Sequence, residues 1–356
     1  MRKSGVELLR VYSIFLILIN HVFTLVLGAP THIELINNPI PTVTKISFIS
    51  LAIICVNTFV IISGWFEIKR STFGLAKLIF QCIFFYLLEL LINYLFIDHS
   101  FFINGDIVKG LISSIFRGWF ISAYIILFLI APIINSYVTS YNQKSCRTIL
   151  GFIYFFLFIY GWLFISSSGN QSTFQRGYSF LFLAVLYFTV RYIKVFYFDT
   201  STDNWLKNIS RNQWFIIYII TVILNIVLEF TFLRYNLGYL STLIFQYTSP
   251  IIIIQSFCIF RFFAGLKFQS KLVNTIGGSA LAIMLIHFSN NGFFFKKIIT
   301  HLYRLYSGIS CISLIFAFLI SISILGLLTD QVRIILWKLI EPKIKDIILK
   351  TKNLVG

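Results

Sequence analysis

Apolar stretches of about 18 to 25 residues recur along the whole length of this 356-residue chain. Stretches of this length and composition are typical of helices that cross a lipid bilayer. The composition agrees, since 58% of the residues are hydrophobic, 12% are charged and the mean hydropathy is +0.89. We expect an all-α, polytopic integral membrane protein with about ten transmembrane helices, at residues 6–28, 46–66, 75–97, 119–138, 148–165, 178–198, 214–233, 239–263, 276–295 and 309–328.

The basic residues support one orientation of these helices. Ten spans place both termini on one side of the membrane, and if that side is the cytosol, about three quarters of the Lys and Arg residues fall in inner segments. Topology thus explains the net charge of +17 without nucleic acid as a partner. We expect a single transmembrane domain over residues 1–356, located in the cell (plasma) membrane as a multi-pass protein surrounded by lipids.

Two further segments have amphipathic patterns. Residues 106–117 carry their apolar side chains on one stripe, which predicts an interfacial helix on the outer surface. Residues 329–356 form a basic amphipathic tail that we expect to lie on the anionic inner leaflet.

Residues 29–45 hold three prolines and predict a stiff outer connector. The five cysteines show no spacing typical of a metal site or a disulfide framework.

The first apolar stretch contains two groups that membrane helices seldom carry, Arg10 and His21. They are eleven residues apart, so both leave the same face of a helix, about 16 Å apart along its axis. A cleaved signal peptide is an alternative for residues 2–30, but the apolar run is long for one and Asn20 and His21 interrupt its centre. A functional site is the default interpretation of ionisable groups at such depth.

Other apolar segments also hold polar or interfacial residues, each with a structural alternative. Ser63 precedes a glycine that would allow close helix packing, and Glu89 would be either paired or protonated. A Trp near the interface is usually an anchor but can also stack on a sugar ring, and a buried His can simply link two helices. As pocket candidates we name Asn57, Ser63, Glu89, Trp119, Tyr124 and His287.

Several of these residues occur in an order that resembles the acyltransferase 3 family of integral membrane acyltransferases. The resemblance rests on Gly5 to Arg10 followed by Asn20-His21, on the stretch from Asn57 to Phe66 that ends in Ser-Gly-aromatic, on Trp119-Phe120 with Pro132 ending the fourth span, and on Leu285-Ile286-His287. It extends over nearly the whole chain, and Arg-x10-His in the first span is its most specific part.

The resemblance implies a membrane O-acetyltransferase. Such a protein takes an acetyl group from cytosolic acetyl-CoA, which is a substrate and not a resident cofactor, and transfers it to a hydroxyl of a surface polysaccharide or its lipid-linked precursor. His21 suits the role of general base, and Arg10 that of a cation facing the donor. Members of the family often carry a further arginine pair after the Ser-Gly motif, where this chain has the adjacent Lys69 and Arg70, which would add to donor binding.

Two other classes of protein also fit ten spans. A transporter or exporter of a polysaccharide or small molecule would use the buried Glu89, Glu229, His21 and His287 as a proton path. Pro250 predicts a kink in the stretch 239–263. Against a transporter, however, no matching pair of Gly- or Pro-broken segments is evident in the two halves of the sequence. A structural membrane scaffold would leave Arg10 and His21 without a purpose. Direct transfer and a covalent acyl-enzyme both agree with the sequence.

Overall fold

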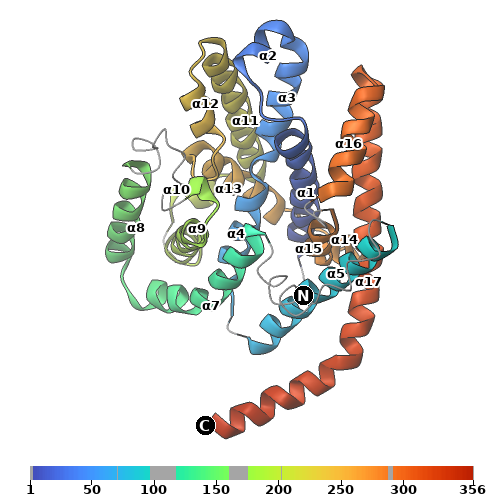
Figure 1. The fold of residues 1–356 in the computed structure, drawn as a ribbon. Coiled ribbons are helices and arrows are strands. Elements are labelled where there is room, and N and C mark those ends of the chain that lie inside the picture. The colour runs from blue at the N-terminus through green and yellow to red at the C-terminus, as the bar shows by residue number, and fades with distance from the viewer. Residues whose placement is uncertain are drawn as a thin grey trace. The chain divides into compact units, whose positions relative to one another are not determined.

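A computed structural model describes residues 3–69, 71–96, 118–159, 175–201, 203–287 and 292–355, and every element in these ranges is a helix (Figure 1). The α-helices are α1 (Ser4–His21), α2 (His32–Asn37), α3 (Pro39–Ala52), α4 (Cys55–Phe66), α5 (Thr72–Phe96), α7 (Trp119–Ser140), α8 (Gln143–Phe158), α9 (Phe180–Ile193), α10 (Trp205–Asn208), α11 (Arg211–Arg234), α12 (Gly238–Ile244), α13 (Pro250–Ala264), α14 (Lys271–Gly278), α15 (Ala280–His287), α16 (Phe293–Leu305) and α17 (Gly308–Val355). Short π-helices extend α1 as η1 (Val22–Val26) and α9 as η5 (Lys194–Phe198), and η4 (Gln175–Gly177) is a 3₁₀ turn.

Seven helical segments within the described residues are long and apolar enough to cross a membrane. They are Ser4–Val26, Pro39–Phe66, Thr72–Leu95, Trp119–Ser140, Phe180–Phe198, Arg211–Arg234 and Gly308–Lys350. The prediction of an all-α, membrane-embedded protein is therefore confirmed, while the number ten and the side of the termini stay predictions. The interfacial helix expected at 106–117 lies outside the described residues.

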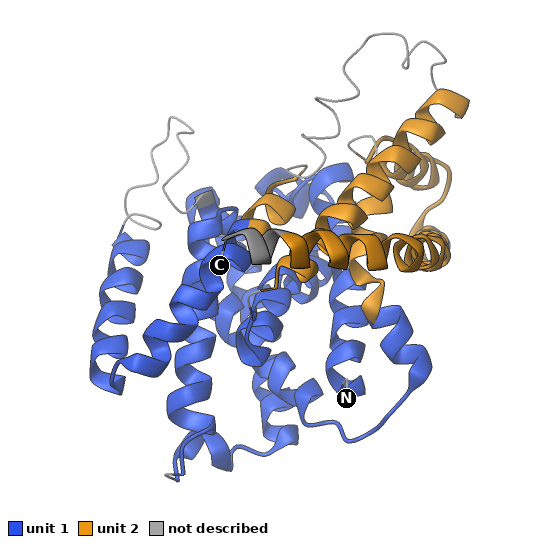
Figure 2. Ribbon diagram, turned by 90° about the horizontal axis from the view of Figure 1, so that it is seen from below, with its two compact units in different colours: residues 1–69, 126–277 blue, residues 70–125, 278–356 orange. Residues whose placement is uncertain are grey.

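The chain forms two compact units, each assembled from segments that are distant in the sequence (Figure 2). Unit 1 comprises residues 1–69 and 126–277, and unit 2 comprises residues 70–125 and 278–356. In unit 1, Tyr12 of α1 stacks on Phe263 of α13 with ring centroids 5.7 Å apart. In unit 2, Trp337 of α17 packs on Phe73 and Phe80 of α5.

The prediction of a stiff connector at residues 29–45 is wrong in part. Residues 32–37 form α2, which Thr31 and Glu34 begin with a reciprocal capping box, and α3 starts at Pro39, seven residues before the predicted span. Prolines in the first turn of a helix are tolerated because the N–H groups there have no partner within the helix. Pro39 and Pro41 therefore begin this helix and do not prevent it.

The eighth apolar stretch, predicted as one span over 239–263, is broken. Helix α12 ends at Ile244, residues 245–249 form a non-helical turn, and Pro250 starts α13. The turn is buried from Gln246 to Ser249, and Pro250, which predicts a kink in this stretch, is the first residue of α13, so the helix is interrupted and not merely bent. The ninth stretch also divides, into α14 and α15 at Ser279.

The basic tail at 329–356 is not a separate element, because α17 continues from Gly308 to Val355 and includes it. Within this helix Asp330 is fully buried and pairs with Arg333 at 2.6 Å. Ser279 donates to the other oxygen of Asp330 at 2.7 Å. This polar cluster ties Ser279, the residue before α15, to α17 inside unit 2.

Candidate functional site

Arg10 and His21 lie on one unbroken helix, as the sequence predicts. Their separation of eleven residues within α1 places both on the same face. The Arg10 guanidinium is about one-third exposed and donates to Glu7 Oε1 at 2.6 Å. His21 is half-buried and is followed at once by the π-helix η1, a type of local widening that is often found at functional sites.

The first turn of α1 is seated tightly on the segment that follows α13. Ser4 Oγ donates to Asn274 Oδ1 at 2.9 Å and accepts from the Ser270 N–H at 2.9 Å. A Cβ on Gly5 would lie 2.4 Å from the carbonyl oxygen of Phe263, so only glycine fits there. These contacts fix the position and rotation of α1, and therefore the direction in which its Arg10 face points.

Glu7 is the residue that holds Arg10, and sequence reasoning did not include it in the site. Its side chain is 3% exposed, and its Oε2 has no hydrogen-bond partner among the described residues. A Cβ on Gly277 would lie 2.7 Å from this Oε2, so α14 packs closely against the carboxylate. The i,i+3 spacing of Glu7 and Arg10 was the signal that could have identified the pair.

The other predicted residues of unit 1 have well-defined structural contacts. Asn57 is fully buried and donates from Nδ2 to the carbonyl of Tyr247 at 2.9 Å, which joins α4 to the turn between α12 and α13. Ser63 donates to the carbonyl of Phe59 within its own helix. A Cβ on the adjacent Gly64 would lie 3.0 Å from Val190 Cβ, which confirms the close-packing interpretation of this small-residue pair.

Four predicted residues belong to unit 2, so the structure does not bring them together with Arg10 and His21 in one compact unit. Glu89 is buried in α5. The rings of Trp119 and Tyr124 both contact the Phe120 ring, each with its centroid 5.8 Å from that of Phe120. His287, 2% exposed at the end of α15, has its Nδ1 3.1 Å from the carbonyl oxygen of Ile283.

Basic residues gather at one end of unit 1, which we name the basic end: the starts of α1 and α11 and the ends of α4, α9 and α13. Lys3 lies 5.9 Å from the ring of Phe66, so the start of α1 is beside the end of α4. The exposed Lys69 follows this end of α4 in the sequence. Arg191 pairs with Glu67 at 3.3 Å. Of the predicted donor residues, Arg70 lies outside the described residues.

Arg261 also lies at the basic end, surrounded by aromatic rings. Its guanidinium is 4.1 Å from the ring centroid of Phe198 and 4.9 Å from that of Trp65. Among the described residues its buried Nε has no hydrogen-bond partner. The aromatic rings stabilise the charge of the guanidinium and hold it at the last turn of α13.

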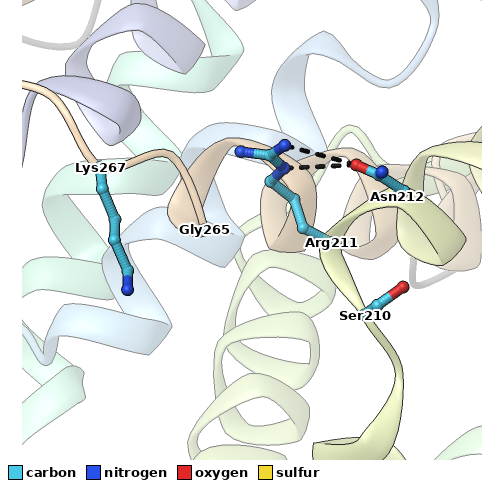
Figure 3. A pocket seen from close by; sticks show the side chains of 5 residues that line it. All are labelled: Ser210, Arg211, Asn212, Gly265 and Lys267. Carbon is cyan, nitrogen blue, oxygen red and sulfur yellow. Dashed lines mark hydrogen bonds between the residues drawn. The ribbon is translucent and has the colours of Figure 1, made fainter.

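A shallow pocket of about 390 Å³ opens at the basic end between the start of α11 and the end of α13 (Figure 3). It is lined by Ser210, Arg211, Asn212, Gly265 and Lys267. The stem of Arg211 crosses Gly265 so closely that a Cβ there would lie 3.2 Å from Arg211 Cγ. Figure 3 shows the Arg211 guanidinium turned toward Asn212, with Lys267 on the far side of Gly265.

This pocket presents two cations to the solvent, and neither takes part in an ion pair that the described residues form. Two neighbouring cations, Arg211 and Lys267, suit the binding of an anionic group such as a phosphate. Sequence reasoning counted Arg211 and Lys267 only as topological charges, because no phosphate-binding motif accompanies them. Among the described residues no cluster of three His, Cys, Asp or Glu side chains is placed to hold a metal ion.

No protein family, curated protein or solved structure matches this chain in the three comparisons that we made. The fold itself defines the class: an all-α protein embedded in a membrane, with an arginine, a histidine and several buried polar groups inside or at the ends of its apolar helices.

Proposed function

We propose that this chain is a membrane O-acyltransferase, which transfers an acetyl group from acetyl-CoA to a hydroxyl of a cell-surface polysaccharide or its lipid-linked precursor. The observation that carries the proposal is the shared face of Arg10 and His21 on one unbroken helix, with Glu7 fixing the guanidinium. The resemblance of the sequence to the acyltransferase 3 family supports the same reaction.

In this reaction the acceptor oxygen attacks the thioester carbonyl carbon, the C–S bond breaks, and the thiol of CoA leaves. The hydroxyl proton must be removed as the oxygen attacks, and His21 is the group on α1 suited to accept it. Arg10 carries a planar guanidinium whose N–H groups form a rigid fork, so it suits the donor side, where it would pair with a phosphate or steady the thioester.

The basic end is the side from which the donor would enter, and we assign it to the cytosol. CoA carries several phosphate groups, and the pocket that contains Arg211 and Lys267 offers cations to at least one of them. Lys69 lies at this end as well, and Arg261 is positioned by its aromatic neighbours. The acceptor would then reach His21 from the opposite end of α1.

The proposal is tested by CoA release from purified protein given acetyl-CoA and an acceptor glycan. His21→Ala should abolish release while the unfolding temperature stays close to that of wild type. His301→Ala is the matched control, because His301 is exposed on α16. Equal release by the His21→Ala variant would remove His21 from the mechanism.

Arg10 is tested separately, at low donor concentration. Arg10→Lys keeps the charge but loses the bidentate geometry, so it should raise the KM for acetyl-CoA more than it lowers kcat. Wild-type behaviour of this variant at low donor concentration would end the donor-side role.

Transport is the second candidate, and one observation favours it. The break between α12 and α13 places buried non-helical backbone inside an apolar helical cluster, which is how many transporters build their sites. A transporter reconstituted in vesicles would move its substrate without releasing CoA. Release of CoA with transfer of labelled acetyl to the glycan would reject transport as the sole activity.

A further inference from the structure

The turn between α12 and α13 carries more polar side-chain atoms than its own hydrogen bonds pair. Its residues Gln246, Tyr247, Thr248 and Ser249 are all no more than 3% exposed. The Ser249 N–H donates to the carbonyl of Gln246 at 2.9 Å, and Thr248 Oγ1 donates to Gln246 Oε1 at 3.2 Å. Asn57 secures the turn by donating to the carbonyl of Tyr247.

Three side-chain atoms at this turn are buried and have no hydrogen-bond partner among the described residues. They are Gln246 Nε2, Ser249 Oγ and Asn57 Oδ1, which together offer a donor, a hydroxyl and an acceptor. Buried polar atoms in an apolar surrounding are costly unless they are paired. Because three unpaired atoms surround one turn, a polar ligand that hydrogen-bonds to all of them explains their shared position.

Helix α13 adds its N-terminus to the same place. Ser249 is its N-cap, yet the side chain makes no capping hydrogen bond, and Pro250 occupies the first helical position. The Ser249 hydroxyl is therefore not needed to satisfy the helix. The positive end of the helix dipole also favours a ligand oxygen at this point.

A second pair of unpaired oxygens lies on α11, next to both halves of the broken helix. Asn225 donates to Gln255 of α13 at 2.8 Å, and Glu229 accepts from Ser241 of α12 at 2.7 Å. The remaining oxygens, Asn225 Oδ1 and Glu229 Oε2, are buried without a partner among the described residues. Carboxylate and amide oxygens accept hydrogen bonds from hydroxyl groups.

An aromatic pair links the turn to the surface. The rings of Tyr178 and Tyr247 are 5.0 Å apart between centroids, and Tyr178 is 42% exposed. Gly177 permits this packing, since it adopts φ +93° and a Cβ there would lie 2.5 Å from Tyr247 Cβ. Aromatic faces beside amide, hydroxyl and carboxylate groups are the combination that suits a sugar ring with several hydroxyls.

We propose that the turn between α12 and α13, together with Asn57, Asn225, Glu229 and Tyr178, forms a binding site for an uncharged, hydroxyl-rich ring, the sugar unit that accepts the acyl group. This assignment of an acceptor site rests on the proposed function. The unpaired set contains one carboxylate and no lysine or arginine, so a neutral sugar fits it better than a phosphorylated one.

The test measures binding directly, without acyl transfer. Saturation-transfer NMR on the purified full-length protein would use methyl glucoside, methyl galactoside, methyl mannoside and methyl rhamnoside, with glucose 1-phosphate as the charged probe. In the Arg211→Ser, Lys267→Ser double variant, which lacks the cations of the pocket at the basic end, we expect at least one neutral glycoside to bind more tightly than glucose 1-phosphate. Binding of none of the glycosides, or tighter binding of the phosphate by this double variant, would overturn the site.

Variants separate a binding role from a structural one. Ser249→Ala should weaken glycoside binding by about 2- to 13-fold, the worth of one hydrogen bond, without lowering the unfolding temperature. Glu229→Gln should weaken binding by about tenfold. Ser256→Ala is the matched control: Ser256 is equally buried on α13, but its hydroxyl already donates to the carbonyl of Ile252 at 2.6 Å.

The two proposals fail in distinguishable ways. Glycoside binding that Ser249→Ala weakens, in a protein that never releases CoA, would keep the site and reject the acyltransferase. Unchanged glycoside binding by both Ser249→Ala and Glu229→Gln would overturn the site, whatever the result of the CoA assay.

Discussion

Replacing Gly5 by alanine tests whether the start of α1 is as tightly seated as the structure indicates. The added Cβ would lie 2.4 Å from the carbonyl oxygen of Phe263 and 3.0 Å from Leu266 Cβ. A backbone oxygen cannot rotate away, so α1 must shift, and overpacking of this kind costs about 1–3 kcal/mol. The higher helix propensity of alanine offsets about 0.5–1 kcal/mol of this loss in unfolding free energy.

The matched variant is Gly151→Ala. Gly151 also lies inside a helix, but a Cβ there would meet nothing within 4 Å. It should gain the propensity term without the clash, so the two variants should differ in unfolding free energy by about 1–3 kcal/mol. Thermal unfolding in detergent, followed by circular dichroism, would show this difference as a lower unfolding temperature for Gly5→Ala.

The same variant should also impair the proposed chemistry, because a shifted α1 moves Arg10 and His21 together. We expect a lower rate of CoA release from Gly5→Ala at temperatures where the protein remains folded. Equal unfolding temperatures for Gly5→Ala and Gly151→Ala would refute the close contact between α1 and the end of α13.

Three further predictions follow from other contacts. Asp330→Asn should lower the unfolding temperature strongly, because breaking a buried ion pair costs about 3–5 kcal/mol, whereas Asp346→Asn should leave it nearly unchanged, since that pair with Lys350 is exposed. Arg211→Ser should raise the KM for acetyl-CoA and reduce its dependence on salt, and Lys350→Ser should do neither; equal KM values for the two would exclude the pocket at the basic end from donor binding. Glu7→Gln should raise the same KM by freeing the Arg10 guanidinium, and an unchanged KM would show that Glu7 does not position it.

The sequence predicted the helical class and much of the order of the helices, because long apolar stretches have few alternatives to a helix in a bilayer. It also placed Arg10 and His21 on one face, since a continuous helix has a fixed period. Whether these two residues act on a substrate stays a prediction.

Features that depend on tertiary contacts were not evident from the sequence. Pro250 predicts a kink, but not the full break at residues 245–249, which is stabilised by Asn57, a residue distant in the sequence. The seat of α1 depends on Gly5 and Gly277, whose neighbours only the fold reveals. The prolines at the start of α3 predicted a connector, because proline is common both in loops and in the first turn of a helix. The sequence alone does not distinguish these two positions.

Mass spectrometry of the envelope polysaccharide from cells that produce the wild-type chain or its His21→Ala variant tests the central claim most directly. We predict ester-linked acetyl groups, removable by mild alkali, that are present with the wild-type chain and absent with the variant at equal protein levels in the membrane. Identical acetylation of the polysaccharide in both cells would contradict the account.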